Sequence, residues 1–138
     1  MKVEFVKIGR VVQDPVKVMV AEYEKRLRAY VEVSSQVLKT DYEFVNGIYY
    51  VALDERGNQF TSQALSDKIQ QWQLDPQIKK VCFVIGGPYG LSDTQKMRCS
   101  MLWSLSSGTL TSDLAWLVTW EQVYRAFTIL KGSSYHHA

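Results

Sequence analysis

Five consecutive apolar residues, Val81–Ile85, constrain the fold of this 138-residue chain more than any other stretch. A short unbroken apolar run predicts a strand that is buried on both faces, in the middle of a sheet covered by helices. The run stops at Gly86 and Gly87, which allow a positive φ or a close approach of another group. Ser92 and Gln95 then form a capping-box pattern that predicts the start of a helix. This order of strand, glycine turn and helix favours a ligand site at the carboxyl end of the strand.

The glycine turn matches neither of the two familiar phosphate-binding loops. The spacing of Gly86, Gly87 and Gly90 differs from the dinucleotide fingerprint, and no Lys-Ser or Lys-Thr pair follows as in a P-loop. A tight turn that serves packing alone is therefore a second interpretation of the same residues.

Length and composition predict one globular domain over residues 1–138, because 46% of the residues are apolar and 22% are charged. The formal net charge of +2 does not indicate a nucleic-acid partner by itself, although residues 1–40 are the most basic third. Cys82 and Cys99 lack the spacing of a metal site, and the chain shows neither a signal peptide nor a membrane-spanning apolar run. We therefore expect a soluble cytoplasmic protein without a metal ion or a membrane partner.

Apolar residues recur with strand and helix periods in turn, which predicts an α/β fold with a mostly parallel sheet and helices on both faces. The predicted strands cover residues 2–8, 31–38, 48–53, 81–85 and 103–106. The predicted helices run from an N-cap at Asp14 to Tyr30, from an N-cap at Thr61 or Ser62 to before Asp75, from Asp93 to Leu102, and from an N-cap at Asp113 to Lys131.

The last predicted helix is apolar on nearly every side. Trp116 and Trp120 lie on one apolar stripe, and Leu114 lies on another. A helix of this pattern is buried on nearly every side, which a single domain of this size seldom achieves for a terminal helix. We therefore expect a homodimer whose interface uses this helix. Glu121 and Arg125 stand four residues apart, in the favourable order for a surface ion pair.

Four ordered blocks of the sequence carry a specific resemblance. They are Ile85–Ser92, Trp103–Ser106 with Thr109 and Leu110, Glu121–Ala126, and Tyr135–His136. Together they closely resemble the RlmH family, small bacterial methyltransferases that act on pseudouridine in large-subunit ribosomal RNA. The resemblance covers nearly the whole chain.

The resemblance implies a SPOUT fold with a C-terminal trefoil knot, a homodimer, and S-adenosylmethionine as the methyl donor. It also implies N3 of a pseudouridine in ribosomal RNA, free or in the assembled ribosome, as the substrate. Carried over by position, the cofactor contacts fall on Leu53, Gly87, Ser106, Ser107, Gly108, Thr109, Leu110 and Thr111. The catalytic groups fall on Arg125, Tyr135 and His136, and the imidazole of His136 would take or orient the proton of the target base.

This sequence departs from the family pattern at positions that bear on RNA binding. Family members usually carry Pro-His-Pro where Thr111-Ser112-Asp113 stands, an arginine at Trp116 and a cationic residue at His137, and their segment before the third strand is longer. Because phosphate contacts depend on Arg and Lys, one alternative is a SPOUT-fold cofactor-binding dimer that acts on a different RNA or has lost the reaction. An alternative of another class is a non-catalytic dimeric module whose glycine turn is structural.

Overall fold

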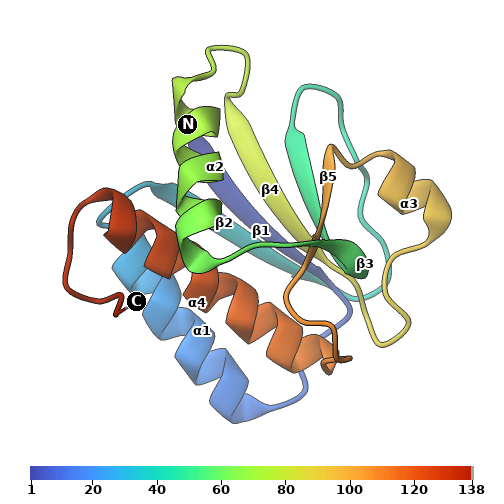
Figure 1. Ribbon diagram of the computed structural model, residues 1–138. Coiled ribbons are helices and arrows are strands. Elements are labelled where there is room, and N and C mark those ends of the chain that lie inside the picture. Colours follow the sequence, from blue (N-terminus) through green and yellow to red (C-terminus); the bar gives the residue numbers. More distant parts are fainter. Residues whose placement is uncertain (138) are drawn as a thin grey trace.

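Five strands and four helices make up the computed structural model, which describes residues 1–137 (Figure 1). The strands are β1 (Lys2–Ile8), β2 (Glu32–Leu38), β3 (Tyr49–Gln59), β4 (Lys80–Ile85) and β5 (Met101–Ser104). The helices are α1 (Asp14–Leu27), α2 (Ser62–Leu74), α3 (Asp93–Met97) and α4 (Ser112–Leu130). All strand pairs are parallel, and the order across the sheet is β2-β1-β4-β3-β5. The apolar run Val81–Ile85 thus forms the buried central strand, as predicted.

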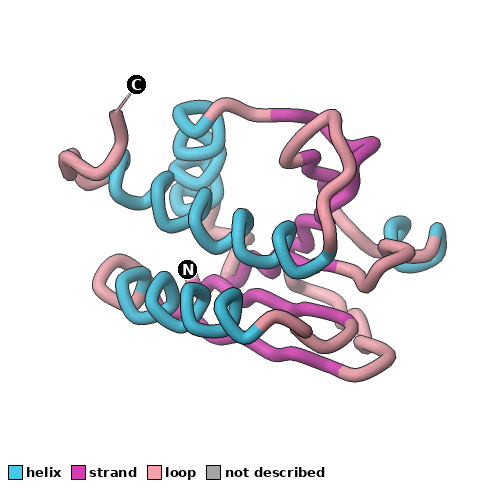
Figure 2. Tube along the Cα trace, turned by 90° about the horizontal axis from the view of Figure 1, so that it is seen from below, coloured by secondary structure: helices cyan, strands magenta, loops and turns pink. Residues whose placement is uncertain are grey.

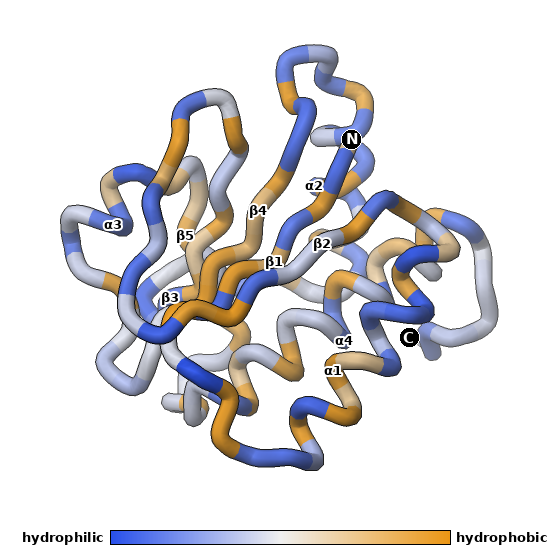
Figure 3. Tube along the Cα trace, turned by 180° about the vertical axis from the view of Figure 1, so that it is seen from behind, coloured by the Kyte–Doolittle hydropathy of each residue, from blue (hydrophilic) through white to orange (hydrophobic). Residues whose placement is uncertain are grey.

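The three longer helices all pack on one face of the sheet, with α4 between α1 and α2 (Figure 2). The other face is covered by the segment of residues 39–48 and by residues that flank the short α3 (Figure 3). Tyr42 and Phe44 from this segment pack their rings against Tyr50 of β3, with centroids 6.0 and 4.8 Å away. The prediction of helices on both faces is therefore wrong for the longer helices, because only ten residues separate β2 from β3 and aromatic rings cover the sheet directly.

One apolar stripe of helix α4 is buried by its own chain. Trp120 is 0% exposed and stacks on Phe5 of β1 with ring centroids 3.6 Å apart, and Trp116 is 2% exposed. Helices α1 and α2 contact its two flanks. The chain itself therefore covers the stripe that carries Trp116 and Trp120, whereas Leu114 on the other stripe is 45% exposed. The homodimer itself stays a prediction.

Strand β3 continues past the end predicted from the sequence. Its pairing with β5 shifts between Leu53 and Asn58, so residues 54–57 form an irregular segment inside the strand. Gly57 lies directly against β5, because a Cβ atom there would be 2.5 Å from the carbonyl carbon of Leu102. The charged residues and the glycine at positions 54–57 predicted that the strand ends there. Instead, the strand is irregular over these residues and pairs with β5 again from Asn58.

Two of the four predicted helix N-caps are confirmed. Ser92 and Gln95 form the expected capping box, and the hydroxyl of Thr61 caps α2. Asp14 is not a cap, since it is the first residue of α1 and Gln13 occupies the cap position without a side-chain hydrogen bond. Helix α3 also ends at Met97, earlier than predicted, because the backbone extends again into β5.

The fourth predicted cap, Asp113, has a different role. Thr111 caps α4 by accepting a hydrogen bond from the amide of Leu114. The buried carboxylate of Asp113 instead accepts hydrogen bonds from the amides of Val12 and Gln13, at 3.0 and 2.7 Å. These bonds fasten the start of α4 to the turn between β1 and α1, 100 residues earlier in the chain.

Candidate functional site

A cleft of about 690 Å³ lies at the carboxyl ends of β4 and β5, beside the irregular segment of β3. Its volume falls in the range of small-molecule sites. Three segments line it: residues 53–56, the glycine turn of residues 85–91, and the loop of residues 105–112. The predicted cofactor residues that line the cleft are Leu53, Gly87, Ser106, Gly108, Thr109, Leu110 and Thr111. Ser107 belongs to the same loop but is not among the lining residues.

The glycine turn owes its shape to close backbone contact. A Cβ atom on Gly86 would lie 2.5 Å from the carbonyl carbon of Gly90, so only glycine fits at this position. The amide of Gly90 donates to the carbonyl of Gly87 at 2.9 Å, and Gly90 is the residue with a positive φ, +73°. At Gly87 a Cβ atom would meet only the carbonyl oxygen of Ile8, at 3.4 Å. Gly87 therefore lines the cleft without a close backbone contact, and its contact with the cofactor stays a prediction.

The loop before α4 is held to the bulge in β3. The hydroxyl of Thr109 donates to the carboxylate of Glu55 at 2.8 Å. Within the loop, the amide of Gly108 donates to the hydroxyl of Ser106 at 3.0 Å, and Ser104 bonds the carbonyl of Ser106 at 2.8 Å. These bonds hold two walls of the cleft at a defined separation.

An ion pair at the cleft was missed by the sequence reasoning. The ammonium of Lys96, on α3, lies 2.6 Å from the Asp54 carboxylate, whose side chain is 8% exposed. Burial acts to raise the pKa of Asp54, but the hydrogen bond from Lys96 and the amide of Arg56 outweigh it and lower the pKa. Asp54 directly follows a predicted strand, so a polar residue at a strand's carboxyl end was the available signal. No signal pointed to Lys96.

The three predicted catalytic residues gather around Glu121 of α4. One carboxylate oxygen, Oε1, accepts from Arg125 Nε at 2.9 Å, from Arg125 Nη2 at 2.5 Å and from the Tyr135 hydroxyl at 3.1 Å. Nη1 of Arg125 lies 3.1 Å from Nδ1 of His136, and its guanidinium carbon lies 4.7 Å from the centroid of the Tyr135 ring. The predicted ion pair of Glu121 and Arg125 is confirmed.

This cluster and the cleft lie toward opposite ends of α4. Ser112, the first residue of the helix, lines the cleft, and Arg125 follows thirteen residues later. At a rise of 1.5 Å per residue, these positions are about 20 Å apart along the axis. One chain therefore assembles the predicted cofactor residues and the predicted catalytic residues separately.

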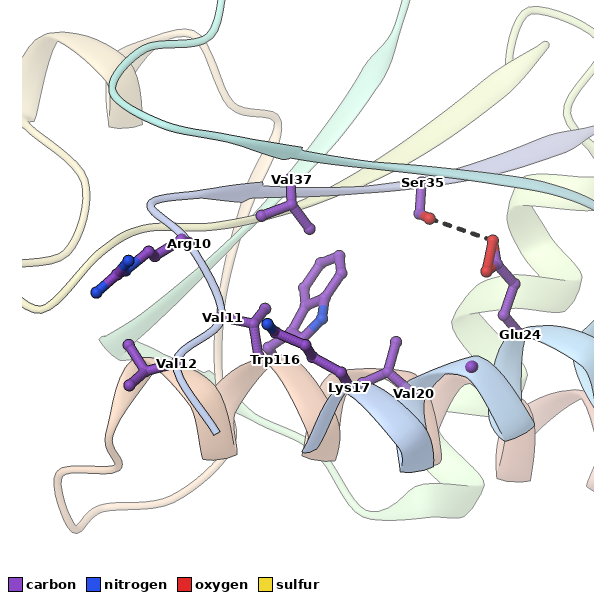
Figure 4. A pocket seen from close by; sticks show the side chains of 10 residues that line it. Arg10, Val11, Val12, Lys17, Val20, Glu24, Ser35, Val37 and Trp116 are labelled. Carbon is purple, nitrogen blue, oxygen red and sulfur yellow. Dashed lines mark hydrogen bonds between the residues drawn. The ribbon is translucent and has the colours of Figure 1, made fainter. Parts of the chain in front are cut away.

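A second groove, of about 480 Å³, lies between α1 and β2 (Figure 4). Val20 and Val37 contribute apolar walls, and Arg10 and Lys17 contribute basic groups. Trp116, which stands where the family usually has an arginine, lines this groove and does not line the cleft. Trp116 therefore lies on the helix-covered side of the sheet, outside the lining of the cleft.

Within residues 1–137, no three His, Cys, Asp or Glu side chains are grouped to hold a metal ion. None of the helices described over the same residues has the length and apolar character needed to cross a membrane. Burial raises the pKa of both cysteine thiols, that of Cys99 to about 11, so neither Cys82 nor Cys99 is a thiolate at neutral pH.

A parallel sheet with a glycine-lined cleft at the carboxyl end of its central strand defines an α/β protein that binds a small organic ligand. Comparison with known proteins identifies the group. Residues 42–136 match the family described as "Predicted SPOUT methyltransferase", and the chain belongs to this family. The resemblance to the RlmH family is confirmed by curated relatives.

These relatives carry one name, "Ribosomal RNA large subunit methyltransferase H". The protein from Christiangramia forsetii is 32% identical over 157 residues, which cover 99% of each chain. The protein from Deinococcus radiodurans is 42% identical over 124 residues, which cover 83% of this chain and 84% of the relative. The first alignment is longer than the 138 residues of this chain, in agreement with a shortened segment here.

Solved structures share the fold at low sequence identity. A probable methylase family protein from Haemophilus influenzae has a TM-score of 0.66 and 10% identity, over 99% of this chain and 70% of that one. A probable methyltransferase from Bordetella pertussis has a TM-score of 0.60 and 13% identity, over 91% of this chain and 95% of that one. These likenesses concern the fold alone.

Proposed function

We propose that this protein transfers a methyl group from S-adenosylmethionine to N3 of a pseudouridine in large-subunit ribosomal RNA. The observation that carries the proposal is the cleft itself, where Leu53, Gly87 and the loop of residues 106–111 meet in a member of the SPOUT methyltransferase family. The name shared by relatives that align with 99% of the chain supports ribosomal RNA as the substrate class.

The residues of the cleft suit S-adenosylmethionine. Leu53 and Leu110 offer apolar surfaces for the two faces of an adenine ring. A Cβ atom added at Gly87 or Gly108 would meet no atom closer than 3.4 Å, so a ligand can approach the backbone at both positions. When bound, S-adenosylmethionine supplies an electrophilic methyl group, which replaces the N3 proton of the base. The chain supplies the positioning that such a transfer requires.

A homodimer is part of the proposal, because one chain keeps its catalytic cluster about 20 Å from its cleft. A second copy would bring Arg125, Tyr135 and His136 to the cofactor. Apolar side chains on the outer surfaces of α1 and α4 support such an interface: Val18, Met19 and Leu114 are 70%, 47% and 45% exposed.

Complementation between two inactive variants tests the shared site. Gly87→Val alters the cleft, and Arg125→Ala alters the cluster. If each site combines two chains, a mixture of the two proteins regains part of the activity that each variant lacks. A mixture as inactive as its components, or a parent with a mass near 15.9 kDa by light scattering, would refute the shared site.

We also propose that the segment before α4 is threaded through the preceding chain to form the trefoil knot of the SPOUT fold. Two observations support this path. Strand β5 lies at one edge of the sheet, whereas α4 returns to the middle and stacks Trp120 on Phe5. The loop between them contributes to the same cleft as the glycine turn of residues 85–91.

The alternative is a cofactor-binding dimer that acts on a different RNA or has lost the reaction. The observation that favours it is Trp116, a buried apolar residue where family members usually offer a cation. Mass spectrometry of ribosomal RNA from cells with and without this protein decides between the two. A methylated pseudouridine present only with the protein supports the proposal, and identical spectra favour the alternative. Calorimetry with S-adenosylmethionine tests the cofactor separately.

A further inference from the structure

The carboxylate of Glu121 accepts hydrogen bonds from its own helix, α4, and from the C-terminal tail. Its Oε1 atom accepts three hydrogen bonds from Arg125 and Tyr135, and its Oε2 atom accepts one from Gln122 Nε2 at 2.8 Å. The amide oxygen of Gln122 in turn accepts from the hydroxyl of Ser62, at the start of α2, at 2.9 Å. The carboxylate is therefore held at both oxygens, and Oε1 has no capacity left for a further partner.

The contact between Arg125 and His136 determines which ring nitrogen of the histidine carries the proton. A guanidinium has donors only, so Nδ1 of His136 must accept the hydrogen bond from Nη1 of Arg125 at 3.1 Å. A neutral imidazole that accepts at Nδ1 carries its proton on Nε2. In this arrangement neither ring nitrogen has a lone pair left to accept a proton. The group that the ring can still offer to a substrate is the N–H of Nε2.

The other members of the cluster are also donors. Burial and the hydrogen bond with Tyr23 raise the pKa of the Tyr135 hydroxyl, which donates to Glu121. The hydrogen bond to Glu121 raises the pKa of the Arg125 guanidinium, which stays charged. The charged and titratable groups in the hydrogen-bonded cluster around His136 are thus Arg125 and Glu121 of α4, Tyr135 of the tail and Tyr23 of α1.

We propose that Glu121 is a positioning residue that holds Arg125, Tyr135 and His136 as one group of hydrogen-bond donors, so that His136 offers Nε2–H to the substrate. His136 then does not remove the proton from the target base, contrary to the role that the family resemblance suggested. This inference rests on the proposed function, because it concerns the same reaction. The donors stabilise the negative charge that develops on the carbonyl oxygens of the base as N3 releases its proton to water.

The 15N NMR spectrum of the histidine rings tests this hydrogen-bonding arrangement without any activity measurement. In the 15N-labelled parent at neutral pH, Nδ1 of His136 should resonate as a ring nitrogen without a proton, and Nε2 as one with a proton. The variant His137→Gln assigns the signals, since it leaves one histidine. A His136 ring that is protonated at Nδ1 would overturn the inference.

Two substitutions of His136 distinguish a donor from a base. His136→Gln keeps a side-chain N–H donor and an oxygen that can accept from Arg125, whereas His136→Leu keeps neither. We expect the Gln variant to retain turnover within about 10-fold of the parent and the Leu variant to lose about 10²-fold or more. Equal loss in both variants would assign the ring as a base and overturn the inference.

Glu121→Gln tests the positioning role, and Glu22→Gln is its matched control. Glu22 pairs with Arg26 on α1 at the same spacing of four residues and the same 2.9 Å distance from Nε to Oε1. We expect Glu121→Gln to lower kcat by about 10- to 100-fold, the range for a lost charge-assisted hydrogen bond, with an unchanged KM for S-adenosylmethionine. Glu22→Gln should match the parent.

Equal kcat values for the two glutamine variants would overturn the positioning role. If the parent itself does not methylate ribosomal RNA, the proposed function fails, and the nitrogen spectrum still decides whether the cluster is arranged as donors.

Discussion

Two adjacent glycines at the cleft should respond differently to the same substitution. In Gly86→Ala, the new Cβ atom would lie 2.5, 2.8 and 2.9 Å from the carbonyl carbon, carbonyl oxygen and Cα of Gly90. All three are backbone atoms, so the turn must open by about 1 Å to reach ordinary contact distances, and overpacking of this kind costs about 1–3 kcal/mol. In Gly87→Ala, the nearest atom is the carbonyl oxygen of Ile8 at 3.4 Å, and φ is not positive.

Thermal unfolding and calorimetry with S-adenosylmethionine separate the two effects. At about 2–4 °C per kcal/mol for a domain of this size, Gly86→Ala should lower Tm by about 2–12 °C. Gly87→Ala should leave Tm within about 2 °C of the parent and weaken cofactor affinity, and Gly87→Val should abolish binding while the fold persists. If Gly86→Ala has the same Tm as the parent, the close contact between residues 86 and 90 does not contribute to stability. If Gly87→Val binds as the parent does, Gly87 does not face the cofactor.

Three further predictions concern the core, the cleft and the tail. Trp120→Ala should destabilise the protein by about 3–5 kcal/mol in denaturant unfolding, because it removes a fully buried ring that stacks on Phe5, and Trp120→Phe should cost clearly less. Because the pKa of Asp54 is lowered in the folded state, its pairing with Lys96 should stabilise the fold above the ordinary carboxyl pKa of about 3.9 and lose this effect as the pH falls below it. Lys96→Met should therefore flatten the acid side of the unfolding free energy below about pH 5, and an unchanged profile would contradict the pairing. Deletion of residues 134–138 should preserve cofactor affinity and oligomeric state but lower methyl transfer by about 10²-fold or more, and undiminished activity would place catalysis elsewhere.

Local sequence patterns predicted those features whose causes are local. The unbroken apolar run and the glycines after it marked the central strand and the cleft, and the capping box at Ser92 lies within four residues of sequence. The residues that line the cleft came from motif resemblance, which encodes geometry that periodicity does not reveal. Periodicity alone places Leu53 in a strand and gives no reason to expect it beside residues 106–111.

The features that the sequence did not reveal depend on contacts between distant segments. The pattern of α4 predicted burial, but it held no information on whether α1, α2 or a second subunit would cover the helix. Asp113 resembled a helix cap because its true partners, the amides of Val12 and Gln13, lie about a hundred residues away. The cluster around Glu121 likewise depends on a tail that folds back onto α4.

The bonds between Asp113 and the first turn of the chain also bear on how this protein folds. They close a loop of about a hundred residues, and contacts of such long range carry a high entropic cost and tend to slow folding. We expect the amide hydrogens of Val12 and Gln13 to exchange freely with solvent until α4 has docked. Their protection from exchange would therefore mark the final closure of the chain, and loosening of the first turn of α4 would be detected at these two amides.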